Sequence, residues 1–491
     1  FLAMVFGMFM AILDIQIVSA SLAEIQAGLS AGADEISWVQ TSYLIAEVIM
    51  IPLSGTLARI LSTRILFTIS AAGFTAASML AATATNIDQM IVYRAIQGFI
   101  GGGMIPSVFA AAYTIFPRSK QAVVAPIIGL VATLAPTIGP TVGGYLSSYF
   151  SWHWLFLINV GPGIVVAAIA WTMIDFDEPE FNLAKSFDWL GFIGMAVFLG
   201  ALEFVLEEGP ANDWLADETI LIFSIVMVAG AAVFFYRAFT AAFPVVDLTA
   251  FGNINFAFGS VFSFVMGIGL YGLVYMYPLY LGRIRGYDAL MIGETVFVTG
   301  IAMFLSAPLS GALSARVDPR KMLLLGFLGF AYSTWMLTGI DADWDFWELF
   351  LPQIIRGASL MFAMVTITNL ALGTLPADRM KNASGLFNLT RNLGGAVGLA
   401  AITTMLSDRT DLHYTRIAET VTAANHTAVD LLDSLARNYA ASGIPGSDAA
   451  LNQLTGMVSQ QAWIMAALFA VLALGAMLMK KPQDGGAPAG H

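Results

Sequence analysis

The chain has 491 residues, of which 58% are hydrophobic and 11% are charged. Soluble domains carry about 25% charged residues, so this composition excludes a soluble core with a solvated shell and indicates a chain whose solvent is mostly lipid. The net charge of −12 argues against nucleic acid as a partner, and the absence of cysteine excludes disulfides and thiolate-bound metals. The four histidines are scattered without metal-ligand spacing, so we expect no metal site and no cofactor.

Apolar runs about as long as the 20 residues that cross a bilayer recur along the whole chain. About fourteen are found, at residues 1–21, 37–57, 65–84, 89–115, 122–145, 154–174, 188–206, 219–239, 256–280, 289–312, 322–340, 347–374, 383–406 and 461–480. Most connections between them are short, whereas residues 407–460 are polar and interrupted at GIPGS (443–447), so we expect a loop or cap outside the membrane there. The sequence predicts an all-α polytopic membrane protein with fourteen spans.

Lysine and arginine predict the orientation of these spans, because cytoplasmic loops carry an excess of both. With the N-terminus inside, the outer loops hold only Arg283, Arg285, Arg409, Arg416 and Arg437. The inner loops hold the larger set, which is Arg59, Arg64, Arg118, Lys120, Lys185, Arg237, Arg316, Arg320, Lys321, Arg379, Lys381, Lys480 and Lys481. We therefore expect both termini in the cytoplasm and the 407–460 loop outside, which is the periplasm in a cell with two membranes.

Two short segments indicate a weak internal repeat. GTLARILSTR (55–64) follows the second span and GALSARVDPRK (311–321) follows the tenth, and each begins with glycine and ends in basic residues. If spans seven and eight are an insertion, each segment closes the second helix of a six-helix half, a layout typical of transporters that bind substrate between two halves. The predicted domains are a six-helix bundle at 1–174, two linker helices at 175–255, a second six-helix bundle with its cap at 256–480, and a cytoplasmic tail at 481–491.

The fifth predicted span contains LAPTIGPTVGG (134–144), where proline and glycine gather inside an apolar run. Small residues recur at every fourth position of it, at Ala135, Gly139 and Gly143. Such a stripe is flat and lets another backbone approach closely, while Pro136 and Pro140 remove two backbone donors and invite a bend. With Gly144, this run is either a hinge that rocks against a partner helix or a static close crossing.

Several motifs together resemble those of one transporter family. LDIQIV (13–18) is similar to a first-helix LDxTIV motif, with Gln16 where threonine is usual, and YRAIQGFIGGGMIPS (93–107) matches a fourth-helix RxxQG motif that contains Gln97. The other matching segments are GPTVGG (139–144), WHWLFLINVGPG (152–163) and LPADRMKNASGLFNLTRNLGGAVG (375–398). By these motifs the chain resembles the major facilitator superfamily, in its fourteen-helix drug:proton antiporter group of the EmrB/QacA type, and is most like the EmrB-type multidrug exporters.

The resemblance implies a major facilitator fold and a proton-coupled transporter rather than an enzyme. It also implies residence in a bacterial inner membrane, with an EmrA-like periplasmic adaptor protein and an outer-membrane channel as partners. These motifs are specific for the group, but they do not identify a substrate.

Two positions depart from the family pattern. The loop after the second span normally reads GxLaDRxGR, but here Arg59 stands in place of the aspartate and Ser62 replaces the next glycine. In INVGPG the proline lies one residue later than usual. The acid that the resemblance assigns to the inward gate is therefore absent from this loop.

Ionisable residues inside spans are costly and mark candidate functional sites. At 1.5 Å per residue, Asp14 lies roughly 12 Å, Glu47 roughly 15 Å and Arg94 roughly 9 Å from the outer ends of their spans. A carboxyl at that depth can take a proton from the outside and release it to the inside, so we predict that these three residues couple proton movement to transport. The alternatives are a hydrogen-bond acceptor for Asp14, a static ion pair for Arg94 and a direct substrate contact for Glu47.

A second set of polar residues in the spans forms the predicted substrate cavity, namely Gln16, Gln97, Glu294, Arg356, Asn388 and Arg391. Glu294 lies near the end of its span, where it is alternatively a side chain that snorkels to the interface. Arg356 lies deeper, and a pairing role is its alternative. Arg391, which resembles the family's thirteenth-helix arginine, is alternatively held by structural hydrogen bonds to Asn388 and Asn392.

Two further segments have simpler interpretations. Glu203, Glu207 and Glu208 crowd the outer end of the seventh span, and we interpret them as solvated. YGLVYMYPLY (271–280) offers an adaptable aromatic surface that suits either varied hydrophobic ligands or packing against lipid.

The sequence as a whole predicts a proton-coupled antiporter that exports hydrophobic or amphipathic compounds by alternating access between two bundles in the lipid bilayer. A metabolite importer or uniporter of the same superfamily is the first alternative, and the antiporter-like fifth helix argues against it. A non-transporting receptor or scaffold is the second, and the intramembrane acids argue against that.

Overall fold

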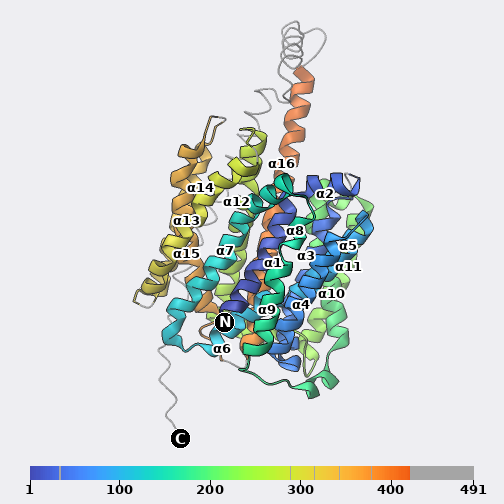
Figure 1. The fold of residues 1–491 in the computed structure, drawn as a ribbon, viewed down its shortest axis with the longest axis vertical. Coiled ribbons are helices and arrows are strands. Elements are labelled where there is room, and N and C mark those ends of the chain that lie inside the picture. The colour runs from blue at the N-terminus through green and yellow to red at the C-terminus, as the bar shows by residue number, and fades with distance from the viewer. Residues whose placement is uncertain (33–34, 288, 315, 342, 377–378, 421–491) are drawn as a thin grey trace.

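The computed structural model describes residues 1–32, 35–287, 289–314, 316–341, 343–376 and 379–420, and its helices run back and forth along one common axis (Figure 1). Within these residues, eleven helices are long and apolar enough to cross a membrane, or up to twelve when one bent pair is counted as a span. The predicted all-α polytopic membrane class is confirmed. The fourteenth predicted span, at 461–480, lies outside the described residues, as do the tail and most of the predicted cap.

Except for α2 (Leu22–Leu29), which lies in the connection between the first two predicted runs, the α-helices of the described residues follow the predicted apolar runs. They are α1 (Leu2–Ala20), α2 (Leu22–Leu29), α3 (Trp38–Leu61), α4 (Thr63–Ala82), α5 (Ile87–Gly101), α6 (Met104–Ile115), α7 (Arg118–Tyr149), α8 (Trp154–Leu157), α9 (Val160–Met173), α10 (Trp189–Glu208), α11 (Glu218–Thr240), α12 (Ile254–Arg283), α13 (Ala289–Ser314), α14 (Pro319–Met336), α15 (Phe346–Ala371) and α16 (Met380–Thr420). Among the described residues, short 3₁₀ helices lie in connections at Phe181–Ser186, Gly209–Ala211, Trp214–Ala216, Leu248–Gly252 and Leu337–Gly339. The predicted fourth span is divided into α5 and α6, and the sixth into α8 and α9.

Polar caps mark the points where several helices begin. The backbone N–H groups of a first helical turn have no intrahelical acceptor, so a side-chain oxygen there stabilises the start of the helix. Such caps are provided by Asn86 for α5, Asp188 for α10, Asp217 for α11, Asn253 for α12 and Asp318 for α14. At α15, Asp345 and Glu348 form a reciprocal capping box.

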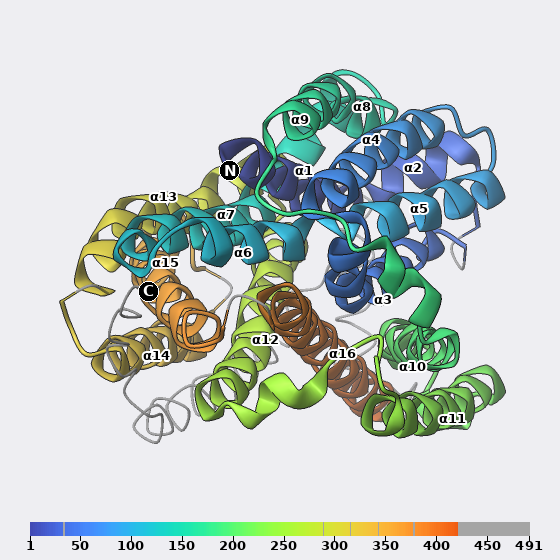
Figure 2. The same cartoon turned by 90° about the horizontal axis from the view of Figure 1, so that it is seen from below.

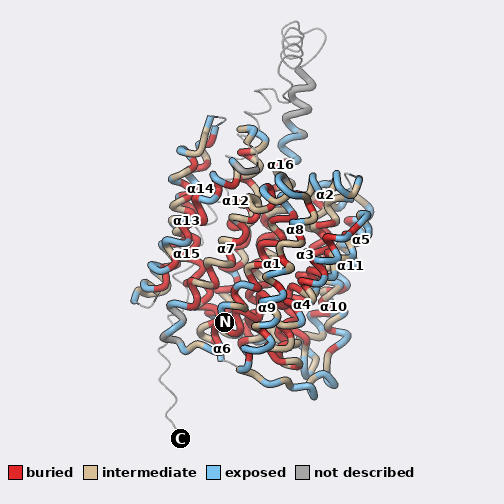
Figure 3. The backbone as a smooth tube through the Cα atoms, in the orientation of Figure 1, coloured by how far each residue is buried: buried red, intermediate tan, exposed pale blue. Residues whose placement is uncertain are grey.

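Two lines of contact hold the helices together across the molecule. On one side α7 packs against both α1 and α13, and on the other α16 packs against both α12 and α3. Buried residues gather along these inner lines, while exposed residues lie at the helix ends and on the periphery (Figure 3).

The helices α10 and α11 lie together at one edge of the molecule (Figure 2). They pack mainly on each other, and α10 also contacts α3 and α16. Only 17% of the apolar window of α11 is buried, so most of that helix faces outward. This peripheral place fits an inserted helix pair, while the division into two six-helix bundles stays a prediction.

The proline- and glycine-rich run lies in α7, which changes direction by 43° between Val123–Pro136 and Ile138–Ser147. Its small-residue stripe packs on α1. A Cβ atom added at Gly143 would lie 2.7 Å from the carbonyl oxygen of Ile17, and one added at Gly139 would collide with the Cβ of Gln16. The residues Ala135, Pro136 and Gly144 are buried as well. The structure thus shows a bent helix in a close crossing, and the hinge movement stays a prediction.

The helix α16 extends beyond the predicted span at 383–406. It remains helical to Thr420, and its upper end projects past the ends of the other helices (Figure 1). The first part of the predicted 407–460 loop is therefore a continuation of this helix.

We expect Gly143→Ala to lower the stability of the protein, because its new Cβ atom would press on the backbone of α1. Overpacking costs about 1–3 kcal/mol. The matched control is Gly161→Ala in α9, where a Cβ atom meets nothing within 4 Å. That change should leave stability the same or raise it, because alanine favours a helix by about 0.5–1 kcal/mol. The melting temperature of the purified protein should fall for Gly143→Ala and should not fall for Gly161→Ala, and equal melting curves for the two variants would refute the close crossing.

Candidate functional site

A cluster of four buried side chains joins α1, α5 and α9. Asp14 Oδ2 accepts a hydrogen bond of 2.6 Å from Arg94 Nη1, and Asp14 Oδ1 accepts one of 2.6 Å from Asn159 Nδ2 and one of 3.1 Å from Gln97 Nε2. Both members of the ion pair are fully buried. We call Asp14, Arg94, Gln97 and Asn159 the charge cluster. Because three donors converge on one carboxylate, its negative charge is compensated without water.

Further contacts fix Arg94 within this cluster. Its Nε donates to the Val39 carbonyl oxygen at 3.1 Å, and its guanidinium lies 4.2 Å from the ring centre of Tyr43 and 5.8 Å from that of Phe156. Aromatic faces attract such a cation and exclude water from it. Gln97 in turn donates to Ser78 Oγ at 2.8 Å, which extends the network to α4.

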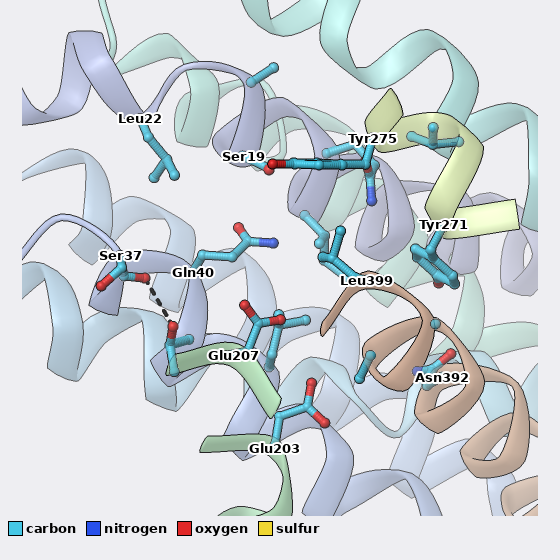
Figure 4. A pocket seen from close by; sticks show the side chains of 18 of the residues that line it. Ser19, Leu22, Ser37, Gln40, Glu203, Glu207, Tyr271, Tyr275, Asn392 and Leu399 are labelled. Carbon is cyan, nitrogen blue, oxygen red and sulfur yellow. Dashed lines mark hydrogen bonds between the residues drawn. The ribbon is translucent and has the colours of Figure 1, made fainter. Parts of the chain in front are cut away.

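A cavity of about 600 Å³ lies beside this cluster (Figure 4). Its walls come from α1, α3, α10, α12 and α16, and Pro140 of α7 also lines it. The cavity reaches exposed residues at the helix ends near α2, including Ser19, Ala211 and Arg283. It therefore opens at the upper end of Figure 1, and we call it the upper cavity.

Four glutamates and one arginine line the upper cavity. Glu47 comes from α3, Glu203, Glu207 and Glu208 come from α10, and Arg283 lies at the end of α12. The interpretation of Glu203 as solvated is wrong, because Glu203 is only 6% exposed. Its neighbours Glu207 and Glu208 are half-buried, and all three line the cavity. This helix packs against α3 and α16, which is why Glu203 is buried.

The opposite wall is aromatic and apolar. Tyr271, Val274, Tyr275, Pro278 and Leu279 of α12 line the cavity (Figure 4). The segment 271–280 thus presents one face to the cavity, which favours the ligand-binding interpretation of this stretch over packing against lipid.

The structure brings together only some of the predicted site residues. Glu47 lies on the cavity wall and forms no hydrogen bond to Asp14 or Arg94 within the described residues, so the three predicted coupling residues do not form one group. Of the predicted cavity residues, Gln16 lines the cavity and Gln97 belongs to the charge cluster. Glu294 is exposed on α13 and is not among the lining residues.

The two deep arginines are buried and do not line the upper cavity, although Arg391 interacts electrostatically with Glu47 and Tyr271 in its wall. Arg356 Nη2 donates to Thr299 Oγ1 at 2.7 Å, and its guanidinium lies 4.4 Å from the ring centre of Tyr277. Arg391 Nη2 donates to Asn388 Oδ1 at 2.9 Å. Neither arginine nor Asn388 lines the cavity, whereas Asn392, one residue after Arg391, does.

The lower end of the molecule is closed by contacts between α16 and the helices α3 and α4. Lys381 Nζ donates to Asp177 Oδ2 at 2.5 Å and to the Ala58 carbonyl oxygen at 3.0 Å. Asp177 also accepts hydrogen bonds from the backbone and side chain of Thr63, the first residue of α4. We call this group the lower contact. Beside it, a Cβ atom added at Gly55 would lie 2.8 Å from Lys381 O, so the backbones of α3 and α16 touch.

Sequence reasoning missed three kinds of site residue. Asn159 stands inside the INVGPG segment, and the motif itself was the available signal. Glu203 and Glu207 are separated by one helical turn, which places both on one face of α10. Asp177 lies in the connection after α9, far from Lys381 in the sequence, and no local pattern marks it.

Helices that meet at one end, a mainly apolar cavity with several carboxyl groups that opens at the other end, and a buried ion pair beside that cavity are typical of a membrane transporter of the alternating-access class. Residues 4–399 match the model of the Major Facilitator Superfamily, and the chain belongs to this superfamily. The predicted family and fold are thereby confirmed, and both are those of a transporter.

Named relatives extend over nearly the whole chain. It is 45% identical to the colistin resistance protein EmrB of Acinetobacter baumannii, over 92% of this chain and 88% of the relative. It is 27% identical to the multidrug export protein EmrB of Escherichia coli K12, over 99% of this chain and 95% of the relative. Among solved structures, the proton:xylose symporter XylE shares the fold, with a TM-score of 0.61 and 13% identity over 97% of this chain and 94% of that one.

We expect Asp177→Asn to loosen the lower contact, because Lys381 then loses the carboxylate with which it forms an ion pair. A cysteine introduced at Ser54, which is buried in α3, reports the opening, and the chain contains no other cysteine. Thiol labelling at that position should become faster in the variant.

The matched control is Asp175→Asn in the same connection. Asp175 pairs with Arg64 at 3.6 Å, but its side chain is 87% exposed, and exposed pairs contribute only about 0–1 kcal/mol. Labelling should be unchanged in this control. Equal rates in both variants would show that Asp177 does not hold the lower end closed.

Proposed function

We propose that this chain is a proton-coupled antiporter that exports hydrophobic or amphipathic compounds by alternating access. The observation that carries the proposal is the placement of consecutive residues on α1. Asp14 lies in the charge cluster, whereas Ile15 and Gln16 line the upper cavity. A change in the protonation of Asp14 therefore occurs next to residues of the same helix that would contact a bound substrate.

Protonation of Asp14 supplies the coupling step. The neutral acid loses its ion pair with Arg94 and keeps fewer acceptor sites for Asn159 and Gln97. The contacts that hold α1 to α5 and α9 then weaken. Because α1 also touches the α7 stripe at Gln16 and Ile17, its movement reaches the bend in α7 and, through α7, the helix α13.

The described conformation has its cavity open at the upper end and its helices in contact at the lower end. The excess of lysine and arginine in the loops at the lower end supports placing that end in the cytoplasm. Substrate is then released from the upper cavity to the outside while the cytoplasmic path is closed. Return to the inward-open form requires the lower contact to break.

The names of the relatives support an exporter in a bacterial inner membrane. Two of them are EmrB proteins, one named for colistin resistance and one for multidrug export. We infer an EmrA-like periplasmic adaptor and an outer-membrane channel as partners, with both termini of this chain in the cytoplasm. The proposed units are two six-helix bundles, at 1–174 and 256–480, joined by α10 and α11.

We expect Asp14→Asn to abolish proton-driven transport while substrate binding persists. Asparagine keeps the shape of the side chain but cannot exchange a proton or pair with Arg94. The measurement is substrate-driven proton movement in proteoliposomes, together with substrate affinity of the purified variant. Proton movement at the wild-type rate in this variant would refute the role of Asp14.

The matched control is Asp188→Asn, which removes another buried carboxylate. Asp188 Oδ1 accepts a hydrogen bond from Arg237 at 2.9 Å where α10 meets α11, away from the charge cluster. Breaking a buried pair destabilises a protein by about 3–5 kcal/mol, so both variants should melt at lower temperature. Only Asp14→Asn should uncouple transport from protons.

A further inference from the structure

The wall that α10 contributes to the upper cavity carries two carboxyl groups, Glu203 and Glu207, that pair with no other side chain among the described residues. Glu203 is only 6% exposed and lines the cavity, and within the described residues its side chain forms no hydrogen bond or ion pair. Glu207 follows one turn later on the same face and also lines the cavity, and its side chain forms no hydrogen bond or ion pair with the part of the chain that the structure describes. Both carboxylates lie toward the cavity in Figure 4.

A second helix supplies an independent sign of an unfilled site. Glu47 of α3 is 3% exposed and lines the same cavity, and its Oε1 atom has no hydrogen-bond partner. The lining amide oxygen of Asn392 is also unpartnered. Buried polar atoms are normally satisfied, so acceptors left open on two walls of one cavity point to a ligand that brings donors or positive charge.

Among the described residues of the lining, Arg283 is the only cationic one, and it lies exposed at the mouth. It makes no hydrogen bond or ion pair with the glutamates within the described residues. A carboxylate in a poorly solvated site is stable only with a proton or a cation beside it. The lining thus contains several carboxyl groups of this kind, and the proton or cation beside each of them must come from outside the protein.

We propose that the α10 wall recognises positive charge, so that the exported compounds include amphipathic cations whose charged group pairs with Glu203 and Glu207. This inference rests on the proposed export function and names its substrate class. The two carboxylates are about 6 Å apart along the helix axis, which fits a ligand with two neighbouring positive charges better than one with a single charge. The apolar body of the ligand lies against Tyr271 and Tyr275, whose faces also attract cations.

The test is equilibrium binding to the purified full chain in lipid nanodiscs, with empty nanodiscs subtracted. The probes share one ten-carbon tail and differ in charge: decanoate, 1-decanol, decyltrimethylammonium, and the decyl derivative of pentamethyl-1,3-propanediammonium, which carries two charges. We expect affinity to rise in that order.

Glu203→Gln and Glu207→Gln should each lower the affinity for decyltrimethylammonium on the order of tenfold, and the double variant should lower that for the dication further. Binding of 1-decanol should not change, because glutamine keeps the shape of the cavity. The control is Glu24→Gln in α2, which removes an exposed charge on the same side of the molecule and does not line the cavity. Thermal melting confirms that all variants are folded.

Three results would overturn the inference. The wild type could bind decanoate or 1-decanol as tightly as the cations. The α10 variants could bind both cations as the wild type does. They could lose the neutral and cationic probes equally, in which case the carboxylates serve the fold or the proton step. Because binding is measured without a proton gradient, an absence of proton-driven export would contradict the proposed function and leave the binding result to decide the substrate class.

Discussion

In lipid, the charge of a side chain must be balanced by an opposite charge or by hydrogen bonds from the protein itself. Asp14 and Arg94 balance each other in this way among the first helices of the chain. The carboxylate takes donors from α5 and α9, and the guanidinium reaches back to a carbonyl oxygen next to the start of α3. Four helices are thus held through one buried anion. Neutralising that anion removes a shared contact, which is why one proton can act on several helices at once.

The same constraint divides the buried acids into two kinds. Asp14 and Asp188 each have an arginine within 3 Å, and both lie where helices meet tightly. Within the described part of the chain, Glu47 and Glu203 have no such partner, and both line the upper cavity. A carboxylate that is fully paired by the protein holds helices together, whereas one left open is available to a proton or a ligand. Whether a buried carboxylate is paired with an arginine therefore distinguishes the coupling and structural acids from the acids that line the cavity.

The sequence could predict the helices, the family and the pairing partners Asp14 and Arg94, because apolar length and local motifs mark them. It could not predict which face of each helix lines the cavity. A span that is apolar all round has no periodic signal for its inner face, so Arg356 and Arg391 look as suitable as Gln16, yet only Gln16 reaches the cavity. Glu203 was misjudged for a related reason: its place near the end of α10 suggested water, and only the packing of α10 on α3 and α16 buries it.

The lower contact shows how a missing motif residue need not mean a missing interaction. Arg59 occupies the position where the family pattern has an aspartate. Because Arg59 and Lys381 are both positively charged, they cannot form an ion pair. Asp177 arrives from the connection after α9 and pairs with Lys381 while it also accepts from the first residue of α4. What closing this end requires is a carboxylate that reaches both α16 and α4. That requirement is spatial, and a residue distant in sequence satisfies it as well as the motif would.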